Sequence, residues 1–228
     1  DTVQAEIKRR KSIGRPSSCT SPFSTKIICE CCGGYYGSKV WGSNTKYKYT
    51  IWRCNDKYKG DSKCKTPHFT EDELKARFVA AFNQLIDVRD ELIADIGIAK
   101  IALCDNSKMA LEIVQLESEM EVAAELSRKI IFENAQMIMN QTEFNAKNDE
   151  YLKRYKQAND KITELTEKQR KQKAKALLLD RFALKLQAQS EVIEKFDIDL
   201  WTATIHYVTA TKTGKLIFVF KDGTKIES

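Results

Sequence analysis

Four cysteines in the first third of the chain have the residue type and spacing of a metal site. Cys29 and Cys32 are separated by two residues and Cys54 and Cys64 by nine, with 21 residues between the pairs. Four thiolates are a ligand set that Zn²⁺ takes in structural sites, where tetrahedral coordination leaves no position for a reactive water. The pattern therefore predicts one structural Zn²⁺, whose binding would supply folding energy to a piece too small to fold alone.

The identity of the ligands is open at two points. Cys31 could chelate in place of Cys32, but Gly33 favours Cys32, because glycine accepts the backbone turn of a metal knuckle. His68 lies four residues after Cys64 and could compete as the fourth ligand. The two remaining cysteines are interpreted as ordinary thiols: Cys19 and Cys104.

The rest of the composition narrows the class of protein. Seven cysteines without a secretion signal favour a reducing, cytoplasmic setting. The start, DTVQAEIKRRKS, has no apolar signal region and no Met, so we expect a fragment of a longer protein. There is no run of 18 apolar residues, and no glycine-rich phosphate loop, GxSxG or HExxH motif. The sequence therefore predicts neither a membrane span nor an active site.

Positive charge is concentrated at the cysteine-containing end. Residues 1–70 carry 14 Lys and Arg against 5 Asp and Glu, a net charge of +9, whereas residues 71–228 carry 24 against 27, a net charge of −3. Such an excess suits a polyanion, most often nucleic acid. A solvated surface without a partner is the alternative.

The elements that must position the cysteines follow from local patterns. A Gly-, Pro- and Ser-rich linker covers 13–22, and alternating, aromatic segments within 23–66 predict strands: FSTKIIC, YYGSKVWG and KYKYTIWRC. Thr70 and Glu73 form a capping-box pattern that starts a helix, and a second helix is expected over about 87–103.

Residues 107–175 contain no Gly or Pro and predict two long helices with a sustained seven-residue repeat, around a break at about 133–143. We expect an antiparallel coiled-coil hairpin, or alternatively a helical pair folded against its own domain. Polar Ser127, Asn148 and Gln169 interrupt the seam. The repeat positions singled out for the coiled coil are Leu116, Met120, Ile130, Phe144, Tyr151 and Tyr155.

Strand character returns near the C-terminus. Residues 199–211 and 214–227 are separated by a Lys-Thr-Gly turn and predict a terminal β-hairpin with one more short strand. The predicted fold class is α+β: a small zinc β-ribbon domain with packed helices and a terminal β-hairpin, interrupted by the coiled-coil hairpin. The expected boundaries are 1–22 (end of a preceding domain and linker), 23–106 (first part of the zinc domain), 107–175 (insertion) and 176–228 (second part).

Several segments together resemble one family. IICECCGG, KYKYTIWRC and KCKTPHFTEDELKARF look like the recombinase zinc β-ribbon of large serine recombinases, the integrases of phages and mobile elements. ENAQMIMNQTEFNAKNDEYLKRY resembles part of their coiled coil, and FDIDLWTATIHYVTATKTGKLIFVFKDGTKIE is similar to their closing segment. The resemblance covers nearly the whole chain in the family's order.

The resemblance implies a role in site-specific recombination. Such proteins cut and rejoin two DNA sites through a serine in an N-terminal catalytic domain, which this chain would lack. The chain would bind part of an attachment half-site in the bacterial cytoplasm, and its coiled coil would contact other recombinase subunits. A recombination directionality factor would act near the coiled coil.

Individual DNA contacts are expected at the basic end. A β-ribbon can enter the major groove, and basic side chains of the linker region can follow phosphates or enter the minor groove. Asn44 or Ser43 at the ribbon tip would read base edges. The expected phosphate contacts are Arg9, Arg10, Lys11, Arg15, Lys39, Lys46, Lys48 and Arg53.

Two other classes of function compete with this one. The ribbon and coiled coil could form a protein–protein interaction module without specific DNA binding, or the chain could be the regulatory domain of a larger enzyme. The concentration of charge at the zinc end favours the DNA-binding interpretation. A resolvase-like catalytic domain encoded upstream would distinguish it from both alternatives.

Overall fold

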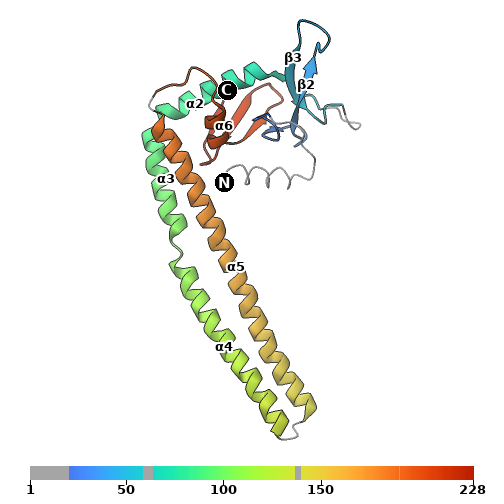
Figure 1. Ribbon diagram of the computed structural model, residues 1–228, viewed down its shortest axis with the longest axis vertical. Coiled ribbons are helices and arrows are strands. Elements are labelled where there is room, and N and C mark those ends of the chain that lie inside the picture. The colour runs from blue at the N-terminus through green and yellow to red at the C-terminus, as the bar shows by residue number, and fades with distance from the viewer. Residues whose placement is uncertain (1–20, 59–63, 137–139, 190) are drawn as a thin grey trace. The chain divides into compact units, whose positions relative to one another are not determined.

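The computed structural model describes residues 21–58, 64–136, 140–189 and 191–228. These residues form two compact units. The first contains the described residues up to Ile96 together with Leu179–Ser228, and the second is Gly97–Leu178 (Figure 1). The first unit mixes strands and helices and the second is a helical hairpin, so the α+β class predicted from the sequence is confirmed.

The predicted ribbon consists of two strands of a three-stranded sheet in the first unit, with the order β2-β3-β4. Strands β2 (Tyr36–Trp41) and β3 (Tyr49–Cys54) are antiparallel, with Tyr36 opposite Cys54 at one end and Trp41 opposite Tyr49 at the other. The short β4 (Phe69–Thr70) pairs with the other edge of β3. The β2–β3 hairpin projects beyond the rest of its unit (Figure 1).

A second sheet joins the two ends of the first unit. Its order is β1-β5-β6-β7, in which β1 (Ile27–Cys29) is parallel to β5 (Ile205–Ala210) and the other pairs are antiparallel. The predicted terminal hairpin is confirmed as β5 and β6 (Leu216–Phe220), with β7 (Lys225–Glu227) as the extra strand. The metal-site strand β1 therefore depends on residues near the C-terminus.

The prediction of strand structure from residue 199 was wrong at its start. Residues Ile198–Thr204 form helix α6, and the strand begins only at Ile205. The Asp197 carboxylate caps this helix by accepting hydrogen bonds from the backbone N–H groups of Asp199 and Leu200 at 2.7 and 2.8 Å. The cap and the burial of Trp201 against the core outweigh the strand propensity of this threonine-containing segment.

Helix α2 (Glu71–Asp87) starts at the predicted capping box. The Thr70 hydroxyl accepts from the Glu73 N–H, and the Glu73 carboxylate accepts from the Thr70 N–H. The helix buries one face at the spacing read from the sequence: Leu74, Phe78, Phe82 and Leu85 are each at most 1% exposed. It is followed by α3 (Arg89–Cys104), as expected.

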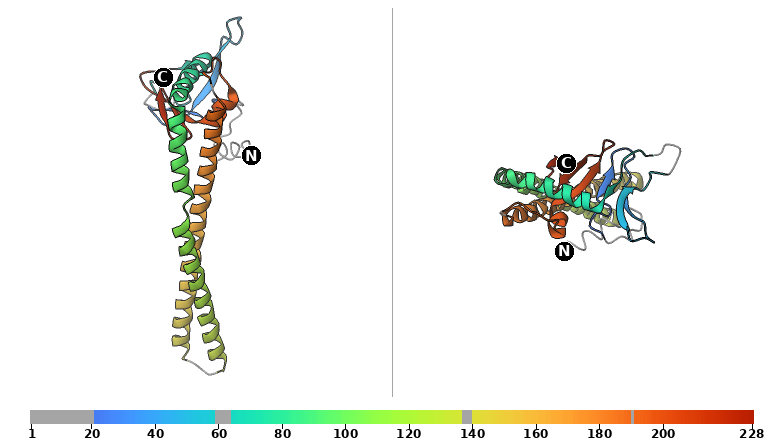
Figure 2. Two further views of the ribbon diagram at one scale, coloured as in Figure 1. Left: turned by 90° about the vertical axis from the view of Figure 1, so that its left-hand side faces the viewer. Right: turned by 90° about the horizontal axis from the view of Figure 1, so that it is seen from above.

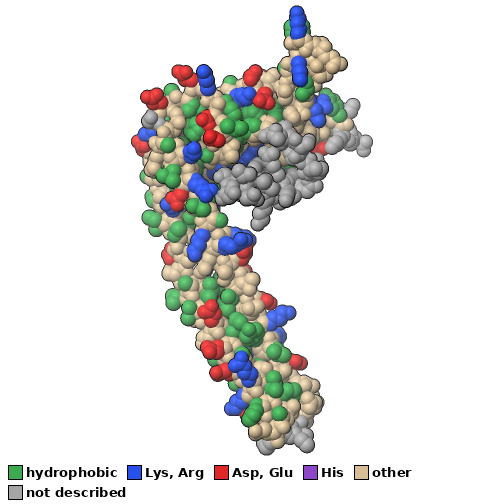
Figure 3. Space-filling model, viewed as in Figure 1, with side chains coloured by type: hydrophobic (Ala, Val, Ile, Leu, Met, Phe, Trp, Pro, Cys, Tyr) green, Lys and Arg blue, Asp and Glu red, His purple; other side chains and the backbone are tan. Residues whose placement is uncertain are grey.

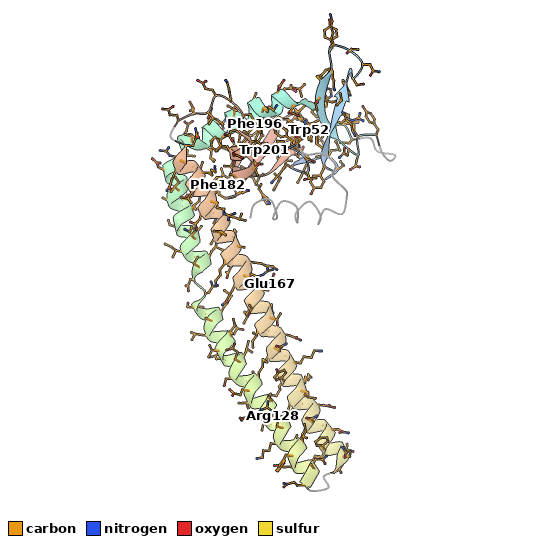
Figure 4. All side chains as sticks on the ribbon, in the orientation of Figure 1. Trp52, Arg128, Glu167, Phe182, Phe196 and Trp201 are labelled. Carbon is orange, nitrogen blue, oxygen red and sulfur yellow. The ribbon has the colours of Figure 1, made fainter. Side chains whose placement is uncertain are left out.

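Aromatic rings fill the core of the first unit. The Trp201 ring centre lies 4.8 Å from that of Phe23 and 5.1 Å from that of Phe78, both in edge-on geometry. Trp52 from β3 reaches the same cluster through Phe23, at 5.7 Å. Figure 4 shows Trp52, Phe196 and Trp201 gathered in this region. The ribbon, α2 and α6 are thus held by one interlocked set of rings.

The second unit pairs α4 (Ser107–Gln136) with α5 (Gln141–Ala188), which run side by side in Figure 1 and in the left view of Figure 2. The Ser127 hydroxyl donates to the Asn148 amide oxygen at 2.8 Å, and Arg154 Nε lies 3.6 Å from Glu119 Oε1. The second contact lies eight residues earlier in α4 than the first, but six residues later in α5. The helices are therefore antiparallel.

The side chains in the hairpin seam follow the predicted repeat, but only some of them are buried. The buried side chains include Ala123, Ile130, Ala158 and Leu165. Of the other residues singled out from the sequence, Tyr155 is 41% exposed, and four are partly buried: Leu116, Met120, Phe144 and Tyr151. On the face in Figure 3, apolar and charged side chains alternate along the hairpin. None of the described helices is long and apolar enough to cross a membrane.

The division between units differs from the boundaries expected from sequence. It falls after Ile96 and before Leu179, whereas the sequence suggested 107 and 175. Helices α3 and α5 run continuously through these points, so no loop marks either boundary in the sequence, and Gly97 at the first boundary does not interrupt α3.

Candidate metal centre and nucleic-acid interface

Four cysteine sulfurs meet at the base of the ribbon. Cys29 ends β1, Cys32 lies in the turn after it, Cys54 ends β3 and Cys64 lies in the segment before β4. The sulfurs of Cys29 and Cys64 are 3.3 Å apart, as are those of Cys32 and Cys54, and all four lie within 4.8 Å of one another. The structure thus brings together the four cysteines selected by spacing.

The cluster has the dimensions of a tetrahedral thiolate site. Zinc–sulfur bonds of about 2.3 Å in a tetrahedron place the sulfurs roughly 3.8 Å apart, within the range seen here. All four cysteines are free thiols, and three of them are buried while Cys32 is exposed. The arrangement could hold one metal ion, with each ligand supplied by this chain.

The first pair of cysteines is held by a glycine turn. Gly33 has φ +69°, a left-handed conformation that glycine adopts without strain. Its N–H donates to the Cys29 carbonyl at 2.9 Å, and the Cys29 N–H donates to the Gly34 carbonyl at 2.8 Å. The conformation that the sequence assigned to Gly33 is therefore present.

The turn that follows Cys54 lies against the turn that contains Cys32. A Cβ on Gly34 would overlap the Asp56 carboxylate and lie 3.4 Å from the Cys32 sulfur. On the Asp56 side, the Lys57 N–H closes a turn by donating to the Cys54 carbonyl at 3.2 Å. A side chain at Gly34 would therefore displace the Asp56 carboxylate.

Thr66 is a site residue that the sequence analysis missed. Its side chain is fully buried, and its hydroxyl oxygen lies 3.3 Å from the Cys29 sulfur and 3.0 Å from the Cys64 sulfur. Lys57 Nζ donates to the Thr66 carbonyl at 2.7 Å. Hydrogen-bond donors beside the sulfurs offset the negative charge that four thiolates bring. A threonine two positions after a cysteine carries no distinctive signal in sequence.

The thiols differ in acidity because their surroundings differ. Partial desolvation raises the pKa of the Cys32 thiol, and burial raises that of the Cys54 thiol. Burial also acts to raise the pKa of Cys64, but hydrogen bonds from the Thr66 hydroxyl and backbone outweigh it and bring that pKa to about 6. The hydrogen bonds from Thr66 therefore favour the thiolate form of Cys64.

The alternative ligands lie outside the cluster. Cys31 is exposed and is not among the grouped thiols. The His68 ring lies against the Trp41 ring, with centres 5.3 Å apart, rather than among the sulfurs. Cys104 is exposed at the end of α3, and Cys19 falls outside the described residues.

The expected DNA-contacting residues lie on the ribbon where they are described. Lys39, Ser43, Asn44, Lys46 and Lys48 are exposed on or beside the β2–β3 hairpin. On the face in Figure 3, its projecting end shows Lys or Arg and no Asp or Glu.

The remaining expected contacts are placed differently. Arg53 is half-buried nearer the cysteines, with its guanidinium 4.6 Å from the Tyr58 ring centre. The sequence predictions for the linker region, Arg9, Arg10, Lys11 and Arg15, fall outside the described residues.

Comparison with known families agrees with this site. Residues 22–83 match the family described as recombinase zinc beta ribbon domain. The match includes all four clustered cysteines, the whole ribbon and most of α2, so this part of the chain is recombinase-related. No curated protein and no solved structure matches the chain.

Proposed function

We propose that the chain is the DNA-binding part of a site-specific recombinase of the serine type. One observation carries the proposal: a ribbon matched to recombinase zinc ribbons has a four-thiol cluster at its base and an exposed basic end. Residues 31–55, which contain β2 and β3, carry four Lys and Arg and no Asp or Glu. Attraction to phosphates is the simplest use of such a surface.

The metal is Zn²⁺ and its role is structural. Cys29, Cys32, Cys54 and Cys64 would hold it, and four thiolates leave no coordination position for a substrate or water. Zn²⁺ would supply a cross-link at the base of the ribbon, where four segments of the chain meet. The Thr66 hydroxyl lies within hydrogen-bond distance of two of these ligand sulfurs and can donate its one proton to a thiolate there.

The ribbon contacts double-stranded DNA at an attachment half-site. A two-stranded ribbon fits the major groove, which is about 12 Å wide. In this arrangement Lys39, Lys46 and Lys48 hold phosphates, while Ser43 and Asn44 reach base edges. The first group sets affinity and its salt dependence, and the second contributes to sequence preference.

The helical hairpin contacts other recombinase subunits during synapsis. Large apolar side chains remain exposed outside its seam, including Leu111 at 66%, Phe132 at 62% and Leu152 at 52%. Exposed apolar side chains of this size favour contact with protein over contact with DNA. The same surface would receive a directionality factor.

The test begins by selecting a duplex from a randomised pool with the zinc-loaded chain. The recovered duplex and a scrambled version are then titrated over a salt series. The proposal expects preference for the recovered duplex, a steep salt slope and loss of binding on chelation. Sequence-blind binding that is indifferent to chelation would contradict it and would favour a module that binds proteins only.

A further inference from the structure

An aromatic patch lies at the projecting end of the ribbon. Trp41, Tyr47 and Tyr49, which we call the aromatic tip, are 41%, 72% and 46% exposed. Trp41 and Tyr49 are directly opposite each other in the β2–β3 register, so their side chains share one face. Their ring centres are 6.0 Å apart in edge-on geometry. The tip therefore presents a joined aromatic surface rather than scattered rings.

The shape of the tip is fixed by its own turn. The Thr45 N–H and hydroxyl both donate to the Gly42 carbonyl, at 2.9 and 3.0 Å, and the Tyr47 N–H donates to the Thr45 hydroxyl at 3.2 Å. Gly42 has φ +63° and too little space for a Cβ beside Thr45. The His68 ring supports Trp41 from the neighbouring segment. Fixed rings lose little entropy on binding a partner.

The tip is surrounded by cations. Lys39, Lys46 and Lys48 flank the three rings, and Lys46 Nζ lies 5.3 Å from the Tyr47 ring centre. A partner that covers this surface must offer negative charge beside apolar groups. Double-stranded DNA does so in its major groove, where phosphates line the edges and the 5-methyl of thymine is the apolar group on the base edges.

We propose that Trp41 and Tyr49 contact thymine methyl groups in the major groove and give the ribbon a preference for thymine. This inference rests on the proposed DNA-binding function and adds a substrate preference to it. The lysines hold the phosphates on either side, while the rings meet the bases. The rings therefore contribute to discrimination, whereas the lysines contribute to affinity for any sequence.

Tryptophan fluorescence reports this contact directly. The sequence has three tryptophans, and Trp52 and Trp201 are at most 1% exposed, so quenching by acrylamide reports Trp41. The zinc-loaded chain is titrated with alternating dA-dT duplex and with dA-dU duplex of equal length, which differs by the thymine methyl alone. We expect dA-dT to bind roughly tenfold more tightly, the size of one base contact, and to shield Trp41 from acrylamide.

Variants separate the rings from the lysines. Trp41→Ala and Tyr49→Ala should each reduce the dA-dT over dA-dU preference while leaving the slope of log K against log salt unchanged. Lys46→Ala with Lys48→Ala should flatten that slope and keep the preference. Tyr58→Leu removes another exposed ring, near Arg53 rather than at the tip, and should keep both.

The outcomes distinguish this inference from the function on which it rests. Binding of both duplexes with equal affinity, or binding with Trp41 still open to acrylamide, would overturn the thymine contact and leave DNA binding intact. Absence of binding to either duplex at low salt would overturn both. Trp41→Phe, which removes the exposed emission, verifies that the quenching signal comes from that residue.

Discussion

The two units of the chain are held together in different ways. The ribbon unit has a core of large rings, such as Phe78 and Trp201, and a cluster of four thiols. The helical hairpin buries mainly small or isolated side chains, among them Ala123 and Ala158, and carries a polar pair in its seam. The free energy gained by burial grows with the apolar area removed from water. We therefore expect the ribbon unit to be more stable to unfolding than the helical hairpin.

Loss of a metal ligand should have the largest effect, because it should destabilise the ribbon unit and leave the hairpin largely folded. Cys54→Ser is expected to abolish stoichiometric zinc binding and remove folding energy on the order of 10 kcal/mol from the ribbon unit. Near-ultraviolet circular dichroism should lose the aromatic signal of this unit, while far-ultraviolet circular dichroism keeps most of the helix signal of the hairpin. Cys31→Ser is the matched control and should retain one zinc per chain. Loss of zinc from that control would instead place Cys31 among the ligands.

Truncation of a core ring should have the next largest effect. Phe78 is fully buried among four other aromatic rings, so Phe78→Ala should lower the free energy of unfolding by about 3–5 kcal/mol. Urea titration followed by tryptophan fluorescence measures this unit. Ile198→Ala, in the same unit but at a residue 54% exposed, should change the value by no more than about 0.5 kcal/mol. Equal effects of the two substitutions would contradict the packing described.

Removal of the Thr66 hydroxyl tests the support around the thiols. Thr66→Val keeps the shape and loses the hydrogen bonds to the Cys29 and Cys64 sulfurs, so zinc affinity should fall roughly 10- to 100-fold. Competition with a chromogenic chelator measures the affinity. Thr66→Ser restores the hydroxyl and should recover most of it. A serine variant as weak as the valine variant would assign the loss to packing.

Removal of one partner of the polar pair in the hairpin seam should destabilise the hairpin, whereas replacement of both partners should not. Ser127→Ala leaves the Asn148 oxygen without its donor and should destabilise the hairpin by about 1 kcal/mol. Ser127→Ala combined with Asn148→Leu replaces both partners and should recover or exceed the original stability. Thermal unfolding followed at the helix signal measures both. Additive destabilisation in the double variant would show that the pair does not face across an apolar seam.

The smallest effect is expected at an exposed ion pair. Lys147 lies 2.6 Å from Glu143, and its hydrogen bond and charge hold the pKa of the Glu143 carboxyl below its usual value. A lowered pKa in the folded state contributes stability above the unfolded-state pKa, which is lost as the pH falls through the folded-state pKa. Lys147→Ala should therefore lower the helix melting temperature at pH 7 by less than Ser127→Ala does. The decrease in melting temperature caused by Lys147→Ala should disappear in acid, where Glu143 is protonated in both chains. A decrease that persisted in acid would mean that the Lys147 side chain stabilises the helix by packing.

Features that depend on neighbouring residues could be predicted from the sequence. The Thr70 capping box, the glycine turn at Gly33 and the helical spacing that buries Phe78 are each specified within a few residues. The grouping of Cys29, Cys32, Cys54 and Cys64 followed from spacing and the geometry of a single metal. These signals sufficed for the α+β class and for the candidate metal centre.

Features that depend on distant partners were missed. The pairing of β1 with β5 joins segments that carry no mark of their relationship, and Thr66 becomes a site residue only where two sulfurs converge on its hydroxyl. Helix α6 was assigned to a strand because its burial around Trp201 is decided by the core. The aromatic tip looked like ordinary strand composition until the register showed Trp41 opposite Tyr49 at the exposed end.

The parallel pairing of β1 with β5 also sets an order of events on the ribosome. Lys26, next to β1, donates to the Ile205 carbonyl, 179 residues further along the chain. Translation at about 5–20 residues per second separates the emergence of these two segments by roughly 10–35 seconds. All four thiols and both long helices emerge within that interval, while the edge of β1 that pairs with β5 remains unpaired. The nascent chain must therefore keep a partly built sheet from pairing with other polypeptides until its last strands are made.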